Sequence, residues 1–260
     1  MITDILKPET ARDAVRARSA PGAAYLGGGT WLNSGRATGI TILVSLERLG
    51  LDRIQADGDG CSIGASVTLQ DMVDSSVVPP ALRAAAGLTA SRTLRNMKTL
   101  GGELGLRADD SALIPVLMVM GAQIRLASRR RPLPVEDYLT SKTEDLILSI
   151  TLPDVSRPCA VRAFSRTSHS PRSLVAAACV APSGSALREI RVVVSDCAGQ
   201  RARILETAAE GAELPSRDRL EGMVARAFQP APDLHVSAEA KRYLAGVLVA
   251  DVVRDLQGEA

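Results

Sequence analysis

The sequence predicts an α+β protein built from two domains, residues 1–157 and 158–260. Three observations predict this class. Strand-like and helix-like segments mix irregularly in the first part. Pro153–Pro158 has the composition of a linker. Beyond it, three strand-like segments precede two helix-like ones, which predicts a C-terminal three-stranded sheet with helices.

Helix starts are the clearest local signals in the first part. Thr10 with Asp13 and Thr68 with Asp71 have the spacing of N-terminal capping pairs. We therefore expect helices from Thr10 to about Ser19 and from Leu69 to about Ser75. Three strands are expected between these two helices: Ala23–Leu26, Ile40–Ser45 and Ser62–Ala65. The turn Asp57–Gly60 leads into the third strand.

The remaining elements follow from apolar runs bounded by glycine and proline. In the first part we expect helices at Ala81–Ala90 and Ser111–Met120, strands at Gln123–Ala127 and Leu146–Leu152, and a turn at Ser128–Pro134. In the second part we expect strands at Val161–Arg166, Leu174–Ala181 and Ile190–Ser195, and helices at Arg217–Phe228 and Ser237–Gln257. In the last helix an apolar stripe is expected to pack on the sheet: Ala240, Tyr243, Leu244, Val247, Leu248 and Val252.

Composition excludes several classes of function. The formal charge is only +2, and the 260 residues include only six aromatic side chains, which argues against nucleic-acid binding. No apolar run is long enough to span a membrane, and the N-terminus does not resemble a secretory signal. A cytoplasmic protein is therefore expected.

Cysteines and histidines do not form a recognisable metal motif. Cys61, Cys159, Cys179 and Cys197 are scattered without a C-x-x-C pair, so we expect reduced core thiols and neither a zinc site nor an iron–sulfur cluster. His169 and His235 are far apart in sequence, and surface or polar-network roles are expected for both. The sequence predicts no catalytic residue and no metal ligand.

A glycine loop, Gly27–Thr30, follows the strand that ends at Leu26. Glycine lets main-chain N–H groups approach an anion closely, and Thr30 adds a hydroxyl donor. The pattern is neither a dinucleotide-binding fingerprint nor a P-loop, so an ordinary glycine-rich turn is the alternative. Trp31 comes directly after the loop and is expected either beside a ligand or in the core.

A second loop, Arg95–Glu103, lies within the polar, glycine-rich segment Ser91–Gly105. It repeats this chemistry with Thr99, Gly101 and Gly102, and Arg95 and Lys98 add positive charge. Two such loops could hold one diphosphate from both sides. A side chain at Gly28 or Gly101 would then fill the space that the diphosphate needs. The alternative is a helix C-cap with an ordinary glycine turn.

An ordered series of motifs resembles one family along nearly the whole chain. The FAD-binding (medium) subunits of xanthine dehydrogenase-like molybdenum hydroxylases show similar motifs in the same order. Here the motifs are Gly27–Thr30, Ile63-Gly64-Ala65 with Thr68, Leu94-Arg95-Asn96, Thr99-Leu100-Gly101-Gly102, Ser111 with Pro115, Leu146–Pro153 and Ser237–Leu244. The chain looks like a short, divergent branch of that family. The resemblance implies an FAD-binding PCMH-type unit of two subdomains, followed by the C-terminal domain.

The resemblance also implies which residues contact FAD. The first loop would hold the diphosphate and the second would close from the opposite side. Ser111 would lie near the adenosine half, and Leu146 and Ile147 would pack around the flavin or adenine. The implied set is Leu26, Gly27, Gly28, Gly29, Thr30, Trp31, Thr99, Gly101, Gly102, Glu103, Gly105, Ser111, Leu146 and Ile147.

Three positions depart from the family pattern: Glu103, Ala112 and Ser165. Glu103 would place a carboxylate beside a diphosphate, which is repulsive unless the carboxylate turns away or bonds a ribose hydroxyl. Asp109 and Asp110 are candidates to replace the acidic residue that is missing at Ala112. The arginine run Arg129–Arg131 is interpreted as a solvated hairpin tip, with a nucleotide or partner patch as the alternative.

Three functions are considered. In the first, the chain is the FAD-containing electron-transfer subunit of a molybdenum hydroxylase. A molybdopterin-binding large subunit and a 2Fe-2S small subunit are then separate chains, and NAD⁺, O₂ or another acceptor takes the electrons. The second is a stand-alone FAD-dependent oxidoreductase. The third is a non-catalytic assembly subunit that has lost flavin.

Overall fold

The computed structural model describes residues 2–35, 37–89, 91–167, 172–182, 187–209, 213–233 and 236–256. These residues form two compact units. Unit 1 comprises residues 1–78, 90–107 and 121–155, and unit 2 comprises residues 79–89, 108–120 and 156–260. Each unit thus combines segments that are separate in sequence. The two domains expected from the sequence, residues 1–157 and 158–260, stay a prediction.

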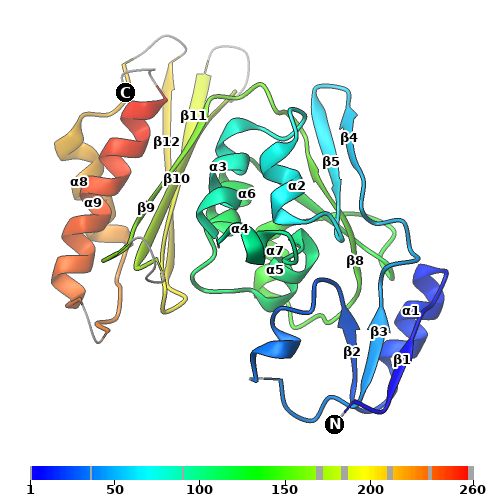
Figure 1. Cartoon of the computed structure of the whole chain (residues 1–260). Coiled ribbons are helices and arrows are strands. Elements are labelled where there is room, and N and C mark those ends of the chain that lie inside the picture. Colours follow the sequence, from blue (N-terminus) through cyan, green and yellow to red (C-terminus); the bar gives the residue numbers. More distant parts are fainter. Residues whose placement is uncertain are drawn as a thin grey trace. The chain divides into compact units, whose positions relative to one another are not determined.

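Unit 1 contains two sheets (Figure 1). A parallel sheet has the order β1-β3-β2, and α1 packs beside it. Its elements are β1 (Asp4–Leu6), α1 (Ala11–Arg18), β2 (Ala23–Leu26) and β3 (Ile42–Ser45). The capping pair predicted at Thr10 and Asp13 is present, because the Thr10 hydroxyl oxygen accepts from the Asp13 amide at 3.1 Å.

The second sheet of unit 1 is antiparallel and has the order β4-β5-β8-β6-β7. Its strands are β4 (Ile54–Asp57), β5 (Gly60–Gly64), β6 (Gln123–Leu126), β7 (Leu133–Pro134) and β8 (Ile147–Leu152). The helices of this unit are α2 (Leu69–Asp74), α4 (Arg92–Arg95), α5 (Leu100–Leu106) and α7 (Val135–Thr140), and a short 3₁₀ turn covers Leu32–Ser34. The predicted capping box of Thr68 and Asp71 starts α2.

Unit 2 is a four-stranded antiparallel sheet with helices packed on its strands. The sheet has the order β12-β11-β10-β9. Its strands are β9 (Cys159–Phe164), β10 (Leu174–Pro182), β11 (Leu187–Asp196) and β12 (Arg201–Ala209). The expected three-stranded sheet was therefore one strand short. The missing strand is β12, which pairs with β11 at the edge.

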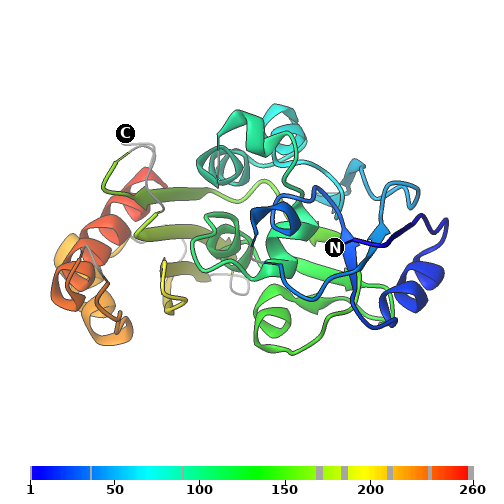
Figure 2. The same ribbon diagram turned by 60° about the horizontal axis from the view of Figure 1, so that its bottom comes forward.

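Two pairs of helices contact this sheet. The helices α8 (Arg217–Ala227) and α9 (Ala238–Asp255) lie side by side along one face (Figures 1 and 2). The helices α3 (Pro80–Thr89) and α6 (Leu113–Val119) contact β9, β10 and β11. The stripe predicted on α9 was partly wrong. Tyr243 is 68% exposed, whereas Ala245, Val249 and Val252 are buried in the core.

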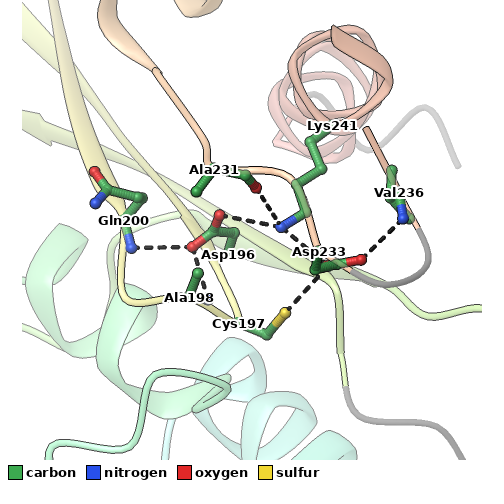
Figure 3. Close-up of polar contacts among 8 residues, drawn as sticks. All are labelled: Asp196, Cys197, Ala198, Gln200, Ala231, Asp233, Val236 and Lys241. Carbon is green, nitrogen blue, oxygen red and sulfur yellow. Dashed lines mark hydrogen bonds and ion pairs between the residues drawn. The ribbon is translucent and has the colours of Figure 1, made fainter. Parts of the chain in front are cut away.

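A buried polar cluster joins α9 to the turn between β11 and β12 (Figure 3). Lys241 is fully buried, and its Nζ donates to the Ala231 carbonyl oxygen at 2.8 Å. Asp233 and Asp196 lie 3.0 and 3.4 Å from the same nitrogen. Asp196 also accepts from the amides of Ala198 and Gln200, both at 2.9 Å, and so orders the turn.

The cysteines correct one expectation. Cys159 and Cys179 lie directly opposite each other on β9 and β10 and are joined as a disulfide, although all four thiols were expected to be reduced. Antiparallel pairing brings together residues that are far apart in sequence, which spacing alone could not indicate. Cys61 and Cys197 are free, and burial raises the pKa of the Cys61 thiol to about 11.

Candidate functional site

Unit 1 contains a cleft of about 440 Å³, a size typical of small-molecule sites. It is formed by the end of β2 and the loop after it, by Lys98 and α5, and by the segment that leads from α7 into β8. Most of the predicted site residues line it together: Gly27, Gly28, Gly29, Thr30, Trp31, Thr99, Gly101, Gly102, Glu103, Gly105, Leu146 and Ile147.

Two predicted site residues do not line the cleft. Leu26 is the last residue of β2, and its carbonyl oxygen accepts from the Leu46 amide at 3.1 Å. Ser111 belongs to unit 2, where its buried hydroxyl makes no hydrogen bond to a described residue. Trp31 lines the cleft and is 38% exposed, so it is not a core residue.

The first glycine loop presents unused main-chain donors. Among the described residues, no protein group accepts a hydrogen bond from the amides of Gly28, Gly29 or Thr30. Gly29 has a φ of +69°, the left-handed conformation that favours glycine. Successive free amides with such a residue among them form a concave site for an anion.

Gly28 is required for a different reason from the one expected. A Cβ at Gly28 would lie 1.5 Å from the Met97 carbonyl oxygen. At Gly101 a Cβ would lie 2.8 Å from the Ala65 carbonyl oxygen. Both glycines therefore allow close packing within the protein, and a larger residue at either position would displace backbone instead of occupying ligand space.

The second glycine loop is helical, which corrects the expectation of bare amides there. Thr99 is the N-cap of α5, and Gly101 and Gly102 lie in its first turn. The Gly101 amide donates to the Ala65 carbonyl oxygen at 2.8 Å, and the Gly102 amide donates to the Thr99 hydroxyl at 3.1 Å. The expected C-cap alternative was also wrong, because the glycines begin a helix.

The helix α5 turns two glycines and a leucine toward the cleft. Gly102, Gly105 and Leu106 are spaced three and four residues apart, so they share one face of α5, and all three line the cleft. A Cβ at Gly105 would meet no atom within 4 Å. This face lets a ligand approach the helix backbone closely.

The carboxylate of Glu103 is neutralised within the protein. Its side chain is only 2% exposed, and Oε2 lies 3.3 Å from the Nζ of Lys98. Lys98 is 26% exposed and lines the cleft. Thus the site holds a paired carboxylate and a cation beside the free amides, which fits a diphosphate better than the sequence suggested.

Charged and aromatic residues that sequence analysis missed line another part of the cleft. Arg18 pairs with Glu144 at 2.5 Å and lies 5.9 Å from the centre of the Tyr25 ring. Burial and the nearby carboxylate of Asp145 raise the pKa of Tyr25 to about 12, so its phenol stays neutral. Arg107 lies 4.7 Å above the Tyr138 ring. No motif marks these residues, because they come from separate elements.

The described part of the chain contains no candidate metal site. No group of three or more His, Cys, Asp or Glu side chains there could hold a metal ion. His169 and His235 lie outside the described residues. None of the described helices is long and apolar enough to cross a membrane.

Comparison with known proteins places the chain in a family. Residues 1–155 match the FAD binding domain in molybdopterin dehydrogenase. This match covers more than half of the 260 residues, and the chain belongs to that family.

One curated relative covers almost the whole chain. The uncharacterized protein YgfM of Escherichia coli (strain K12) is 34% identical over 260 residues, which span 99% of this chain and 97% of that protein.

Two solved structures share the fold at lower identity. CO dehydrogenase from Oligotropha carboxidovorans matches with a TM-score of 0.82 and 21% identity over 100% of both chains. Quinoline 2-oxidoreductase from Pseudomonas putida 86 matches with a TM-score of 0.81 and 18% identity, over 99% of this chain and 98% of that chain. The α+β fold of this chain is therefore shared with these two structures along its full length.

Proposed function

We propose that this chain binds FAD in the cleft of unit 1 and serves as the electron-transfer subunit of a multi-subunit molybdenum hydroxylase. The observation that carries the proposal is the row of free amides at Gly28, Gly29 and Thr30 in a cleft of a chain that belongs to an FAD-binding family. A diphosphate supplies the acceptors that these amides lack.

The charges of the cleft support the same ligand. Lys98 provides a cation next to the amide row, and its contact with Glu103 keeps the ammonium close to α5. Because the Glu103 carboxylate is paired, it does not oppose the diphosphate as a free charge would. Leu146 and Ile147 are buried apolar residues of the cleft wall and would pack against a ring of the cofactor.

The division of labour follows from what the chain contains. Bound FAD supplies the redox chemistry, while the protein binds it, orients it and controls access to it. We propose that electrons arrive from 2Fe-2S clusters on a small subunit, after substrate oxidation at the molybdopterin of a large subunit. NAD⁺, O₂ or another acceptor would then take them from this chain. The family resemblance is the basis for these partners.

Two alternatives predict different observations. A stand-alone FAD-dependent oxidoreductase would hold flavin but would not co-purify with a molybdenum-containing partner. An assembly subunit without flavin would be colourless. The Lys98–Glu103 pair favours flavin binding, since it removes the charge repulsion at Glu103, one of the three features that support a flavin-free assembly subunit.

The first test is the absorbance spectrum of the purified chain. We expect flavin bands near roughly 370 and 450 nm and, after denaturation, about one FAD released per chain. Purification from the native host would then show whether molybdenum and iron accompany the chain. A colourless protein that takes up no added FAD would contradict the proposal.

A further inference from the structure

Arg107 occupies an unusual backbone position at the end of α5. It is the one described residue other than glycine with a positive φ, at 48°. Its amide caps the helix by donating to the Leu104 carbonyl oxygen at 3.0 Å. Glycine or asparagine usually fills such a left-handed cap, because other side chains are strained there. Retained strain of this kind often accompanies a functional side chain.

The side chain of Arg107 is held but not neutralised. One terminal nitrogen donates to the Thr143 carbonyl oxygen at 2.7 Å, and the guanidinium lies 4.7 Å above the ring of Tyr138. Its Nε is buried without a hydrogen-bond partner. No carboxylate of a described residue lies within ion-pair distance of it, in contrast to Arg18, which pairs with Glu144. A buried donor without an acceptor is costly unless a ligand changes its surroundings.

The surroundings of Arg107 suit a planar ring. Tyr138 is only 2% exposed and covers one face of the guanidinium, while Arg107 itself lines the cleft. The opposite face of the Arg107 guanidinium is thus available to stack on a planar ring. A planar guanidinium stacks well on such a ring, whereas an ammonium group does not. The seven residues of α5 place Arg107 about 10 Å along the helix from the first turn that faces the amide row.

We propose that Arg107 stacks on the adenine ring of the bound dinucleotide and so determines the affinity of the ADP half. This inference rests on the proposed binding of FAD. The adenine half is favoured because Tyr138, Leu146 and Ile147 enclose this part of the cleft, each at most 5% exposed. A flavin ring that exchanges electrons with partners needs access that an enclosed ring lacks.

The test separates a ligand role from a capping role. If Arg107 only caps α5, glycine should serve equally well, since it adopts a positive φ without strain. We would measure the Kd of FAD by flavin fluorescence, displacement of FAD by ADP, and thermal unfolding without ligand. The proteins are the apo wild type, Arg107→Gly, Arg107→Lys and, as a control, Arg130→Gly, which removes an exposed arginine of the β6–β7 turn.

We expect Arg107→Gly to bind FAD about tenfold more weakly or worse. The inhibition constant of ADP, measured by displacement of FAD, should rise by a similar factor. The melting temperature of this variant without ligand should stay close to that of the wild type. Arg107→Lys should also bind more weakly, because it keeps the charge but loses the plane. Arg130→Gly should match the wild type. If Arg107→Gly does not fold, Arg107→Lys decides the result alone.

Three outcomes would overturn this inference. Unchanged FAD and ADP affinities in the Arg107 variants would leave FAD binding intact and reduce Arg107 to a cap. A raised Kd of FAD with an unchanged inhibition constant of ADP would assign Arg107 to the flavin half. A wild-type chain that binds no FAD would reject the proposed function and this inference together.

Discussion

At the scale of single residues, Gly105 is informative because nothing in the protein requires it. A Cβ there would be in open space, its φ is not positive, and the residue lies inside a helix. Glycine in a helix costs about 0.8–1 kcal/mol relative to alanine. The proposed binding of FAD against α5 would explain why this position lacks a side chain.

We therefore expect Gly105→Leu to stabilise the unliganded protein by roughly 0.5–1 kcal/mol and to abolish FAD binding, because the new side chain would fill the cleft. Urea unfolding and the flavin content per chain would measure the two effects. Gly87→Ala in α3 is the matched control, since a Cβ there also meets no atom within 4 Å. It should gain similar stability and keep its flavin. Full flavin content in Gly105→Leu would contradict the placement of FAD against α5.

At the scale of elements, the local signals of the sequence were reliable where side chain and backbone interact within one turn. The capping pairs at Thr10 and Thr68 give the starts of α1 and α2, because the hydroxyl and the amide that it accepts from are three residues apart. The strand Ala23–Leu26 and the glycine loop after it were also predictable, and with them one part of the cleft lining.

Elements that depend on tertiary pairing were missed. The strand β12 carries three charged residues, Arg201, Arg203 and Glu206, at a sheet edge, and its pairing with β11 stabilises it more than its own composition does. The helix α7 has six residues and no side-chain N-cap bond, so its sequence carries no start signal. Because α7 was missed, Tyr138 and its contact with Arg107 could not be anticipated.

The helix α9 depends on a buried charge cluster that can be tested. Replacing Lys241 by methionine should leave Asp196 buried without its cation, and we expect a loss of about 3–5 kcal/mol in the free energy of unfolding. Adding Asp196→Asn to Lys241→Met should recover part of that loss, since the amide oxygen can still accept from Ala198 and Gln200. Arg254→Met, an exposed cation on the same helix, should cost little.

The pH dependence of this cluster has a definite sign. Burial alone would lower the pKa of Lys241, but the hydrogen bond to Asp233 and the charge of Asp196 outweigh it and raise the pKa above 10.5. The stabilisation by Lys241 is therefore complete below pH 10.5 and is lost only as the pH rises through the folded-state pKa. The difference in free energy of unfolding between the wild type and the double variant Lys241→Met/Asp196→Asn, which lacks the buried carboxylate, should thus be constant from pH 6 to 9. A difference that varies over this range would contradict the charge assignment.

At the scale of the whole molecule, the chain returns to each unit more than once. The helices α3 and α6 come early in the sequence but belong to unit 2, while the segment between them completes the cleft of unit 1. The sequence predicted a single boundary near residue 157 and could not show that each unit is built from three separate segments. Which unit a segment joins depends on which apolar faces pack together in the folded protein. Every residue that lines the cleft nevertheless belongs to unit 1.

This arrangement predicts where bound FAD will protect the backbone. Hydrogen exchange, compared with and without FAD, should slow most at Gly28, Gly29 and Thr30, because amides that lack an acceptor in the protein would gain one. The amides of Gly101 and Gly102 already have acceptors, so their slowing should be smaller and should reflect stabilisation of α5. Exposed residues of the β6–β7 turn serve as an internal control and should not change. Slowing that leaves Gly28–Thr30 unaffected would mean that the diphosphate is held elsewhere, even in a chain that proves to contain FAD.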